Sequence, residues 1–115
     1  MKNIEKIRSE QLARMFAALG NPHRLAIFER LRRVGTERCH DNNPELCVCD
    51  VAAGTGLSMS TVSHHLKELR AAQLVVSEKR GQSVYCTISP TALELIASFA
   101  GEAPAVGRQG QRKAA

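Results

Sequence analysis

One stretch in the middle of this 115-residue chain constrains its fold more than any other. Its apolar spacing predicts a short helix over about 48–54, which runs into the turn Gly54-Thr55-Gly56. Ser58 or Ser60 then caps a second helix, which extends to about Ala72. Two helices joined by a tight glycine-containing turn are typical of the helix-turn-helix motif.

The second of these helices has one apolar face and one polar face. Four apolar side chains recur at helical spacing and are expected to face the core: Met59, Val62, Leu66 and Leu69. Two β-rich runs follow, over 74–78 and 84–88, around a basic tip at residues 79–83. A hairpin directly after the second helix is a wing, so the pattern predicts a winged helix-turn-helix.

The polar helix face and the basic hairpin tip together predict binding to duplex DNA. Short hydrogen-bonding side chains near the start of such a helix reach base edges in the major groove, and cations farther along meet phosphates. The wing is expected to reach phosphates or the minor groove. Taken singly, Ser60 or Lys67 would be better explained as part of a solvated helix face. The residues expected to contact DNA are Ser58, Ser60, Thr61, Ser63, His64, Lys67 and Arg70 on the helix and Lys79, Arg80 and Gln82 on the wing.

Three further helices are predicted around this centre. The first covers about 3–19 and ends at Gly20. The second begins at Asn21-Pro22, and Gly35 suits its C-terminal cap. The last opens at Pro90-Thr91. The predicted fold class is therefore α+β, mainly α, with about five helices and a two-stranded β-hairpin wing.

The chain is expected to form one domain over residues 1–100. Residues 101–115 are rich in Gly, Ala, Gln and Arg and have no apolar pattern, which predicts a disordered basic tail. A domain of this size buries a limited fraction of its surface, so dimerisation would add stability.

Composition narrows the range of partners. The net charge of +5 and the pI near 9.4 favour an anionic partner, and an aromatic content of 3% argues against stacking of single-stranded bases. No apolar run approaches the roughly 20 residues of a membrane span, and the N-terminus has no signal-peptide core. We therefore expect a cytoplasmic protein with no membrane partner, in which the four cysteines act as metal-binding or redox thiols.

Three of the four cysteines lie in an acidic segment over 37–50. Thiolates are soft donors, which favours As(III), Sb(III), Cd(II), Pb(II), Zn(II) or Hg(II) over hard cations. On a regular helix Cys47 and Cys49 would point about 200° apart, so both can hold one ion only where the backbone is extended or distorted. We therefore expect ligand binding to deform the start of the helix that leads into the DNA-reading helix.

Two thiolates leave this site incomplete, because three are natural for pyramidal As(III) and four donors for tetrahedral Zn(II). Cys39, on the same long loop, is the expected third thiolate. A divalent ion could draw on supplementary donors at His40, Asp41 and Asp50.

Two other candidate ligands are assigned structural roles. Cys86 alternates in phase with the apolar residues of its strand, which predicts a buried small hydrophobe. His64 and His65 are adjacent, so on a helix they point about 100° apart and cannot chelate one ion. His65 is expected to pack beside Leu69 or to bond a carbonyl.

Four runs of the sequence are similar to those of a known family, the ArsR/SmtB family of metal-sensing repressors, over residues from about 15 to 99. The most specific run is Glu45-Leu-Cys-Val-Cys-Asp50, which resembles the metal box of the arsenic and cadmium/lead sensors. The arsenic type often has another Cys three residues later, where this chain has Ala52. The other three runs are Phe16–Phe28, Ser60–Arg70 and Val84–Ile88.

The resemblance implies a homodimer that binds operator DNA and dissociates on binding metal. It also implies a dimer interface between the first and last helices, in agreement with apolar stripes at Ile4/Ile7 and Ile96/Phe99. A twofold dimer predicts a palindromic operator.

The sequence thus predicts a transcriptional repressor released from operator DNA by As(III) or Sb(III) at cysteine thiolates. Two alternatives share the fold: a Cd(II), Pb(II), Zn(II) or Hg(II) sensor, and a thiol-redox or sulfide sensor in which Cys47 or Cys49 pairs with Cys39 or Cys86. An enzyme is not expected, because the chain lacks Cys-x-x-Cys within a βαβ pattern and a base paired with a nucleophile. An architectural DNA protein, the last alternative, would respond to no metal.

Overall fold

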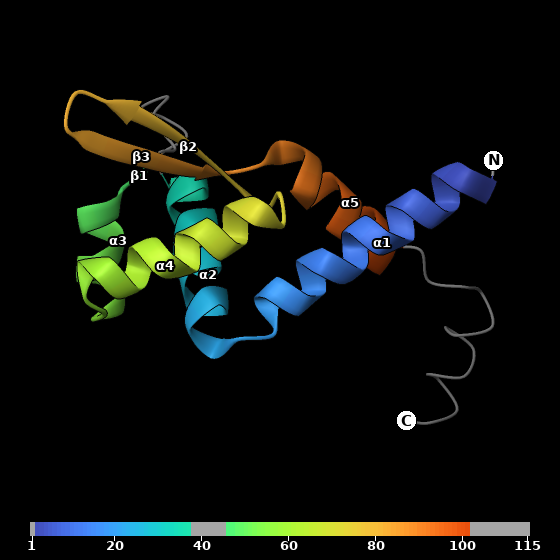
Figure 1. The fold of residues 1–115 in the computed structure, drawn as a ribbon, viewed down its shortest axis with the longest axis horizontal. Coiled ribbons are helices and arrows are strands. Elements are labelled where there is room, and N and C mark those ends of the chain that lie inside the picture. Colours follow the sequence, from blue (N-terminus) through green and yellow to red (C-terminus); the bar gives the residue numbers. More distant parts are fainter. Residues whose placement is uncertain (1, 38–45, 102–115) are drawn as a thin grey trace.

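The described part of the chain folds into five helices and a three-stranded sheet (Figure 1). The computed structural model describes residues 2–37 and 46–101. The helix-turn-helix and the hairpin after it are present, so the predicted winged helix-turn-helix is confirmed. In chain order the elements are α1 (Lys2–Leu19), α2 (Pro22–Glu37), β1 (Leu46–Cys47), α3 (Val48–Thr55), α4 (Met59–Ala71), β2 (Val75–Arg80), β3 (Ser83–Ile88) and α5 (Pro90–Gly101).

The two N-terminal helices begin and end largely as predicted. α1 ends at Leu19, directly before Gly20. The Asn21 side-chain oxygen accepts hydrogen bonds from the backbone N–H groups of His23 (2.9 Å) and Arg24 (3.1 Å), so it caps α2. The C-terminal cap predicted at Gly35 is wrong, because α2 continues to Glu37. Glycine permits a left-handed helix end but does not impose one.

The turn between α3 and α4 follows from two local interactions. Gly56 has a φ of 75° and donates its N–H to the Ala52 carbonyl, which ends α3 in a left-handed conformation that glycine adopts without strain. The Ser58 hydroxyl accepts from the Thr61 N–H at 3.2 Å, so Ser58 rather than Ser60 caps α4.

The sheet contains one strand that the sequence pattern did not predict. β2 and β3 form the expected antiparallel hairpin, and the two-residue strand β1 adds to the other edge of β3, giving the order β1-β3-β2. Leu46 pairs with Cys86, and Cys47 pairs with Tyr85. A strand of two residues has no detectable periodicity, so only its long-range partner reveals it.

The core lies between α2, α3, α4 and the inner face of the sheet, and it also includes Met15 of α1 and Ala92 of α5. Its most deeply buried side chains are Met15, Ile27, Leu31, Leu46, Val51, Val62, Leu66, Leu69, Leu74 and Cys86. Three of the four apolar residues predicted on the inner face of α4 are therefore buried. Met59 is not: its side chain is 55% exposed, because the first residue of α4 extends past the layers that cover the rest of the helix.

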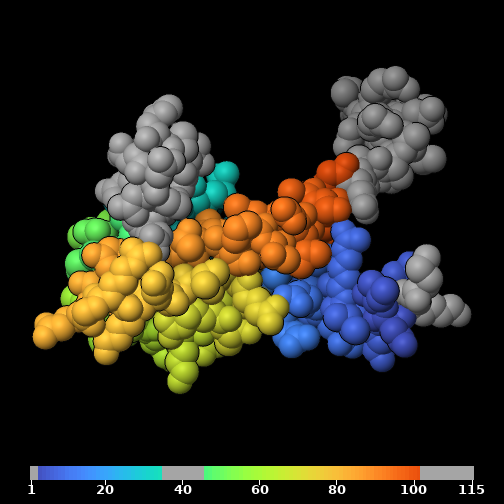
Figure 2. All heavy atoms as spheres, turned by 90° about the horizontal axis from the view of Figure 1, so that it is seen from above, coloured from blue at the N-terminus to red at the C-terminus, as the bar shows by residue number. Residues whose placement is uncertain are grey.

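α1 and α5 lie side by side (Figures 1 and 2). The rings of Phe16 and Phe99 are 5.5 Å apart, and an Arg8 guanidinium donates to the Ser98 hydroxyl at 2.9 Å. Ile4 of α1, which belongs to the apolar stripe expected at a dimer interface, is 68% exposed. Within residues 2–37 and 46–101, no helix is long and apolar enough to cross a membrane.

Candidate functional site

Cys47 and Cys49 meet at the junction of β1 and α3. Cys47 ends the strand and occupies the N-cap of α3 in an extended conformation, with φ −77° and ψ 159°, and Cys49 lies in the first turn of the helix. Their sulfur atoms are 2.6 Å apart. Because Cys47 lies outside the helix, the two thiols already point toward one another. The structure thus meets the condition stated from the sequence, an extended backbone at Cys47. Deformation of the start of α3 on ligand binding stays a prediction.

The two thiols form a donor cluster with a carboxylate. One ligand atom from each of Cys47, Cys49 and Asp50 lies within 4.8 Å of the others, and this is the one such group of three among the described residues. Two thiolates bound to one tetrahedral ion at about 2.3 Å each would be about 3.8 Å apart, so the sulfurs would have to separate by roughly 1 Å. This set of two sulfur donors and one carboxylate oxygen fits a thiophilic ion that also binds oxygen ligands.

The thiol of Cys47 is held in its protonated form. The hydrogen bond with the Cys49 thiol, then burial, then the Asp50 carboxylate raise the pKa of Cys47 above its usual range, against an opposing backbone hydrogen bond. A divalent metal must displace that proton when it binds.

Cys86 belongs to the core. It is 0% exposed, and it shares a face of the sheet with Leu46, whereas Cys47 shares the opposite face with Tyr85. Its sulfur lies 3.4 Å from the Ser77 hydroxyl, and burial raises its pKa. The prediction of a buried strand cysteine is confirmed. The predicted third thiolate, Cys39, and the supplementary donors His40 and Asp41 lie outside the described residues.

A pocket of about 210 Å³ opens beside the thiol pair. Three parts of the fold contribute to its walls: the β1–α3 junction, the first turns of α4, and the turn end of the hairpin. The sequence pattern did not indicate this pocket, because its walls come from segments up to 37 positions apart that meet only in the folded chain. Its lining residues are Cys47, Val48, Cys49, Met59, Ser63, Gln82, Ser83 and Val84.

The predicted DNA-reading face of α4 is largely open to solvent. Thr61 is half-buried, and its hydroxyl accepts a hydrogen bond from Ser58 at 2.8 Å, so these two residues serve the helix cap. Arg70 donates to the Ser77 hydroxyl at 3.2 Å and so leans toward the hairpin. The exposed members of the predicted set are Ser58, Ser60, Ser63, His64, Lys67 and Arg70.

The wing carries its predicted cations at the exposed end of the hairpin. Lys79, Arg80 and Gln82 are all exposed. Arg80 forms a 2.9 Å ion pair with Glu78, and its guanidinium carbon lies 5.0 Å from the centre of the Tyr85 ring. The bond to Arg80 lowers the pKa of Glu78. The arginine is thus held against the hairpin, and part of its charge is already balanced.

His65 is a packed histidine, as predicted. Only 9% of it is exposed, and its ring centre lies 5.8 Å from that of His23 and 5.9 Å from that of His64. The predicted alternative, a bond to a carbonyl, is not seen at Nδ1, which has no hydrogen-bond partner among the described residues. Burial, and then the charge of Arg24, lower the pKa of His65, so it is neutral near pH 7.

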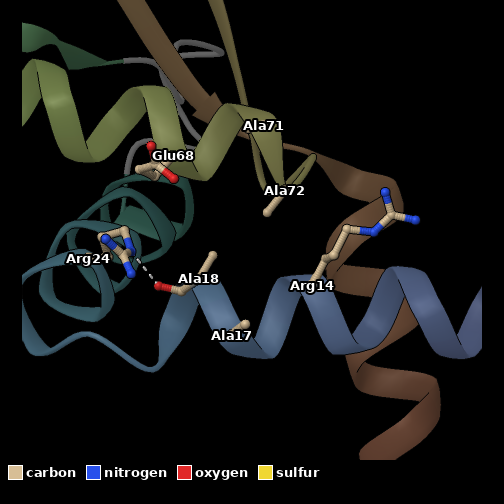
Figure 3. A pocket seen from close by; sticks show the side chains of 7 residues that line it. All are labelled: Arg14, Ala17, Ala18, Arg24, Glu68, Ala71 and Ala72. Carbon is tan, nitrogen blue, oxygen red and sulfur yellow. Dashed lines mark hydrogen bonds between the residues drawn. The ribbon is translucent and has the colours of Figure 1, made fainter.

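A second pocket, of about 290 Å³, lies toward the other end of α4 (Figure 3). Arg24 reaches across from α2 and donates from Nε to the Ala18 carbonyl at 2.6 Å. The remaining walls are Arg14 and Ala17 of α1 and Glu68, Ala71 and Ala72 of α4. Small alanine side chains on facing helices leave this space, and they are the only sequence signal for it.

Residues 42–77, which include both thiols and all of α4, match a family model described as bacterial regulatory protein, arsR family. The chain belongs to the ArsR family.

Individual ArsR-family relatives cover most of this chain. It is 38% identical over 82 residues to the transcriptional repressor SmtB homolog of Synechocystis sp., covering 71% of this chain and 54% of the relative. It is 33% identical over 76 residues to the arsenical resistance operon repressor of Escherichia coli, covering 66% and 57%. The chain thus spans a little over half the length of these relatives.

Solved structures agree with this ArsR-family fold. A homodimeric winged helix-turn-helix DNA-binding domain from Mycobacterium bovis, described as a possible ArsR-family regulator, matches with a TM-score of 0.63 and 26% identity. The match covers 84% of this chain and 82% of that one.

Proposed function

We propose that this protein is a transcriptional repressor that binds duplex operator DNA and releases it when Cys47 and Cys49 bind a thiophilic metal or metalloid. The observation that carries the proposal is the position of the paired thiols, whose pocket is also lined by the first turns of α4 and by the wing. A ligand held there would lie against both elements proposed to contact DNA. The relatives named as repressors support the same role.

We favour As(III) or Sb(III) as the inducer. Trivalent arsenic forms three bonds to thiolates, of which Cys47 and Cys49 supply two, and Cys39 is proposed as the third. The E. coli relative is named for arsenical resistance. A divalent ion such as Cd(II) is the second candidate, because the Asp50 carboxylate lies close to both sulfurs and offers a hard charged donor.

The DNA contacts are proposed on the face that α4 and the wing present together. Ser60, Ser63 and His64 would approach base edges, while Lys67 and Arg70 would meet the backbone. On the wing, Lys79, Arg80 and Gln82 would reach phosphates or the minor groove.

A homodimer through α1 and α5 is part of the proposal. Ile7 is 61% and Phe99 is 57% exposed, which leaves apolar side chains uncovered on both helices of the single chain. The Mycobacterium relative is described as homodimeric. We propose that the protein acts in the cytoplasm, where its thiols stay reduced.

The deciding experiment is a fluorescence-anisotropy titration. The protein is bound to a labelled duplex, selected from a random pool for tight binding, and As(III), Sb(III), Cd(II), Pb(II), Zn(II) or Hg(II) is added. Release by one of these ions, and none with Cys47→Ser or Cys49→Ser, is the expected result. Retention of the duplex with every ion would refute metal response, and failure to bind any duplex would refute the repressor role.

The same assay tests the wing. Arg80→Ala should weaken binding to all duplexes and reduce the slope of log affinity against log salt by about 1, because one phosphate contact is lost. Arg33→Ala, which removes an exposed arginine from α2, is the matched control and should leave the slope unchanged. A loss confined to one DNA sequence would contradict a phosphate role for Arg80.

A further inference from the structure

The pocket beside the thiols shares walls with the surface proposed to bind DNA. Ser63 of α4 and Gln82 of the wing line this pocket, and both also belong to the predicted DNA-contacting set. α3, the start of α4 and the turn of the hairpin lie together at one end of the molecule (Figure 1). The thiol site therefore opens onto the region between the helix and the wing.

The exposure of individual side chains shows that this pocket is accessible from outside. Cys49, Ser63, Gln82 and Ser83 are exposed, and Met59 is 55% exposed in spite of its apolar side chain. Cys47, which also lines the pocket, is half-buried. A group attached to the Cys49 sulfur would project into space next to Met59 and Ser63, which are one helical turn apart on α4.

We propose that this pocket is shared, so that a ligand on the thiols and bound DNA exclude each other by occupying the same volume. The thiols already face one another, so ligation does not need to unwind α3 to act on DNA binding. A substituent on the sulfur is enough, because the helix and the wing that approach the duplex form the other two walls. This inference rests on the proposed DNA-binding function and adds where the ligand sits.

Single-thiol labelling separates this steric mechanism from one that requires both cysteines to be bridged. In the variant Cys39→Ser/Cys47→Ser, Cys49 is the one exposed cysteine in the described chain, since Cys86 is 0% exposed. Alkyl methanethiosulfonates transfer one RS group to its thiolate, forming a disulfide and expelling methanesulfinate. Such an adduct cannot bridge two cysteines.

The affinity for the selected duplex is measured before and after labelling. We expect a methylthio group on Cys49 to weaken binding about tenfold and a benzylthio group about a hundredfold, since the larger group fills more of the pocket. The matched control places the label on Glu29→Cys, an exposed position of α2, in a background with Cys39, Cys47 and Cys49 all changed to Ser. The same adducts there should change affinity less than about twofold.

A reciprocal measurement does not depend on how an adduct affects folding. A saturating amount of duplex should slow the labelling of Cys49 at least about tenfold while leaving the Glu29→Cys rate unchanged, because exclusion is mutual. Equal Cys49 rates with and without DNA overturn the shared pocket.

The two proposals fail in different ways. If an ion releases the duplex from the unmodified protein but DNA does not protect Cys49, the repressor function stands and the shared pocket is wrong. If the unmodified protein binds no duplex, both are wrong.

Discussion

Two places in one small sheet hold cysteines, and they differ in most properties that govern thiol chemistry. Cys47 ends β1 and Cys49 follows in the first turn of α3, with their sulfur atoms 2.6 Å apart beside a pocket, whereas Cys86 faces the core from β3. The pairing of Leu46 with Cys86 puts adjacent residues of β1 on opposite faces. The two cysteines that the strands contain therefore differ in accessibility: Cys86 packs in the core, whereas Cys47 lines a pocket.

The largest expected difference is in chemical accessibility. In a Cys39→Ser background, a water-soluble disulfide reagent should modify Cys49 at least about a thousandfold faster than Cys86, because Cys86 reacts only when the core opens. Labelling followed by peptide mass analysis gives both rates. Similar rates for the two would show that the sheet opens readily, and the contrast would then be lost.

Ligand affinity should show the next largest difference. Structural zinc sites contribute about 10–16 kcal/mol over four ligands, so loss of one thiolate should cost roughly 3 kcal/mol, or about a hundredfold in affinity. We expect this loss for Cys47→Ser and Cys49→Ser, measured by competition with a chromophoric chelator. Cys86→Ser is the control and should bind Cd(II) as the wild type does. If Cys86→Ser lowered the Cd(II) affinity as much as Cys47→Ser or Cys49→Ser does, Cys86 would belong to the metal site.

The pH dependence of binding sharpens the contrast further and separates the two inducer classes. Cys47 has a raised pKa, so below that pKa Cd(II) must release its proton, and affinity should rise at least about tenfold per pH unit. Arsenite, As(OH)₃, takes up thiol protons as water when As–S bonds form, so its affinity should not rise with pH in this range. Titrations with Cd(II) and with arsenite at several pH values test both expectations. Equal slopes of log affinity against pH for the two ligands would contradict the expected difference between the inducer classes.

The smallest expected effect is on folding stability. Cys86→Ser should lower the free energy of unfolding by about 1 kcal/mol, since a hydroxyl replaces a thiol in the core while Ser77 remains as its hydrogen-bond partner. Cys49→Ser, at an exposed position, should change it by less than about 0.5 kcal/mol. Urea unfolding followed by circular dichroism measures both. A larger loss for Cys49→Ser would mean that the thiol pair supports the fold itself.

Sequence reasoning succeeded where the signal is local. The start of α2 at Asn21-Pro22, the glycine-containing turn that ends at Gly56 and the alternation around Cys86 each depend on neighbours within a few residues, and all three are seen. It failed at Met59 and Gly35 for a common reason. Periodicity places a residue on a helix face but does not say whether another element covers that point, or how far the helix continues.

The residue pattern was enough to predict the order of helices, turn and hairpin, the presence of two soft donors two residues apart, and the burial of Cys86. The relative position of those two thiols follows only from the tertiary structure. β1 exists because it pairs with β3, some 40 positions away in the chain, and that pairing holds Cys47 extended beside the helical Cys49. The packing of α4 and the hairpin around this corner then forms the pocket, because no residue near the thiols in sequence encodes its far walls.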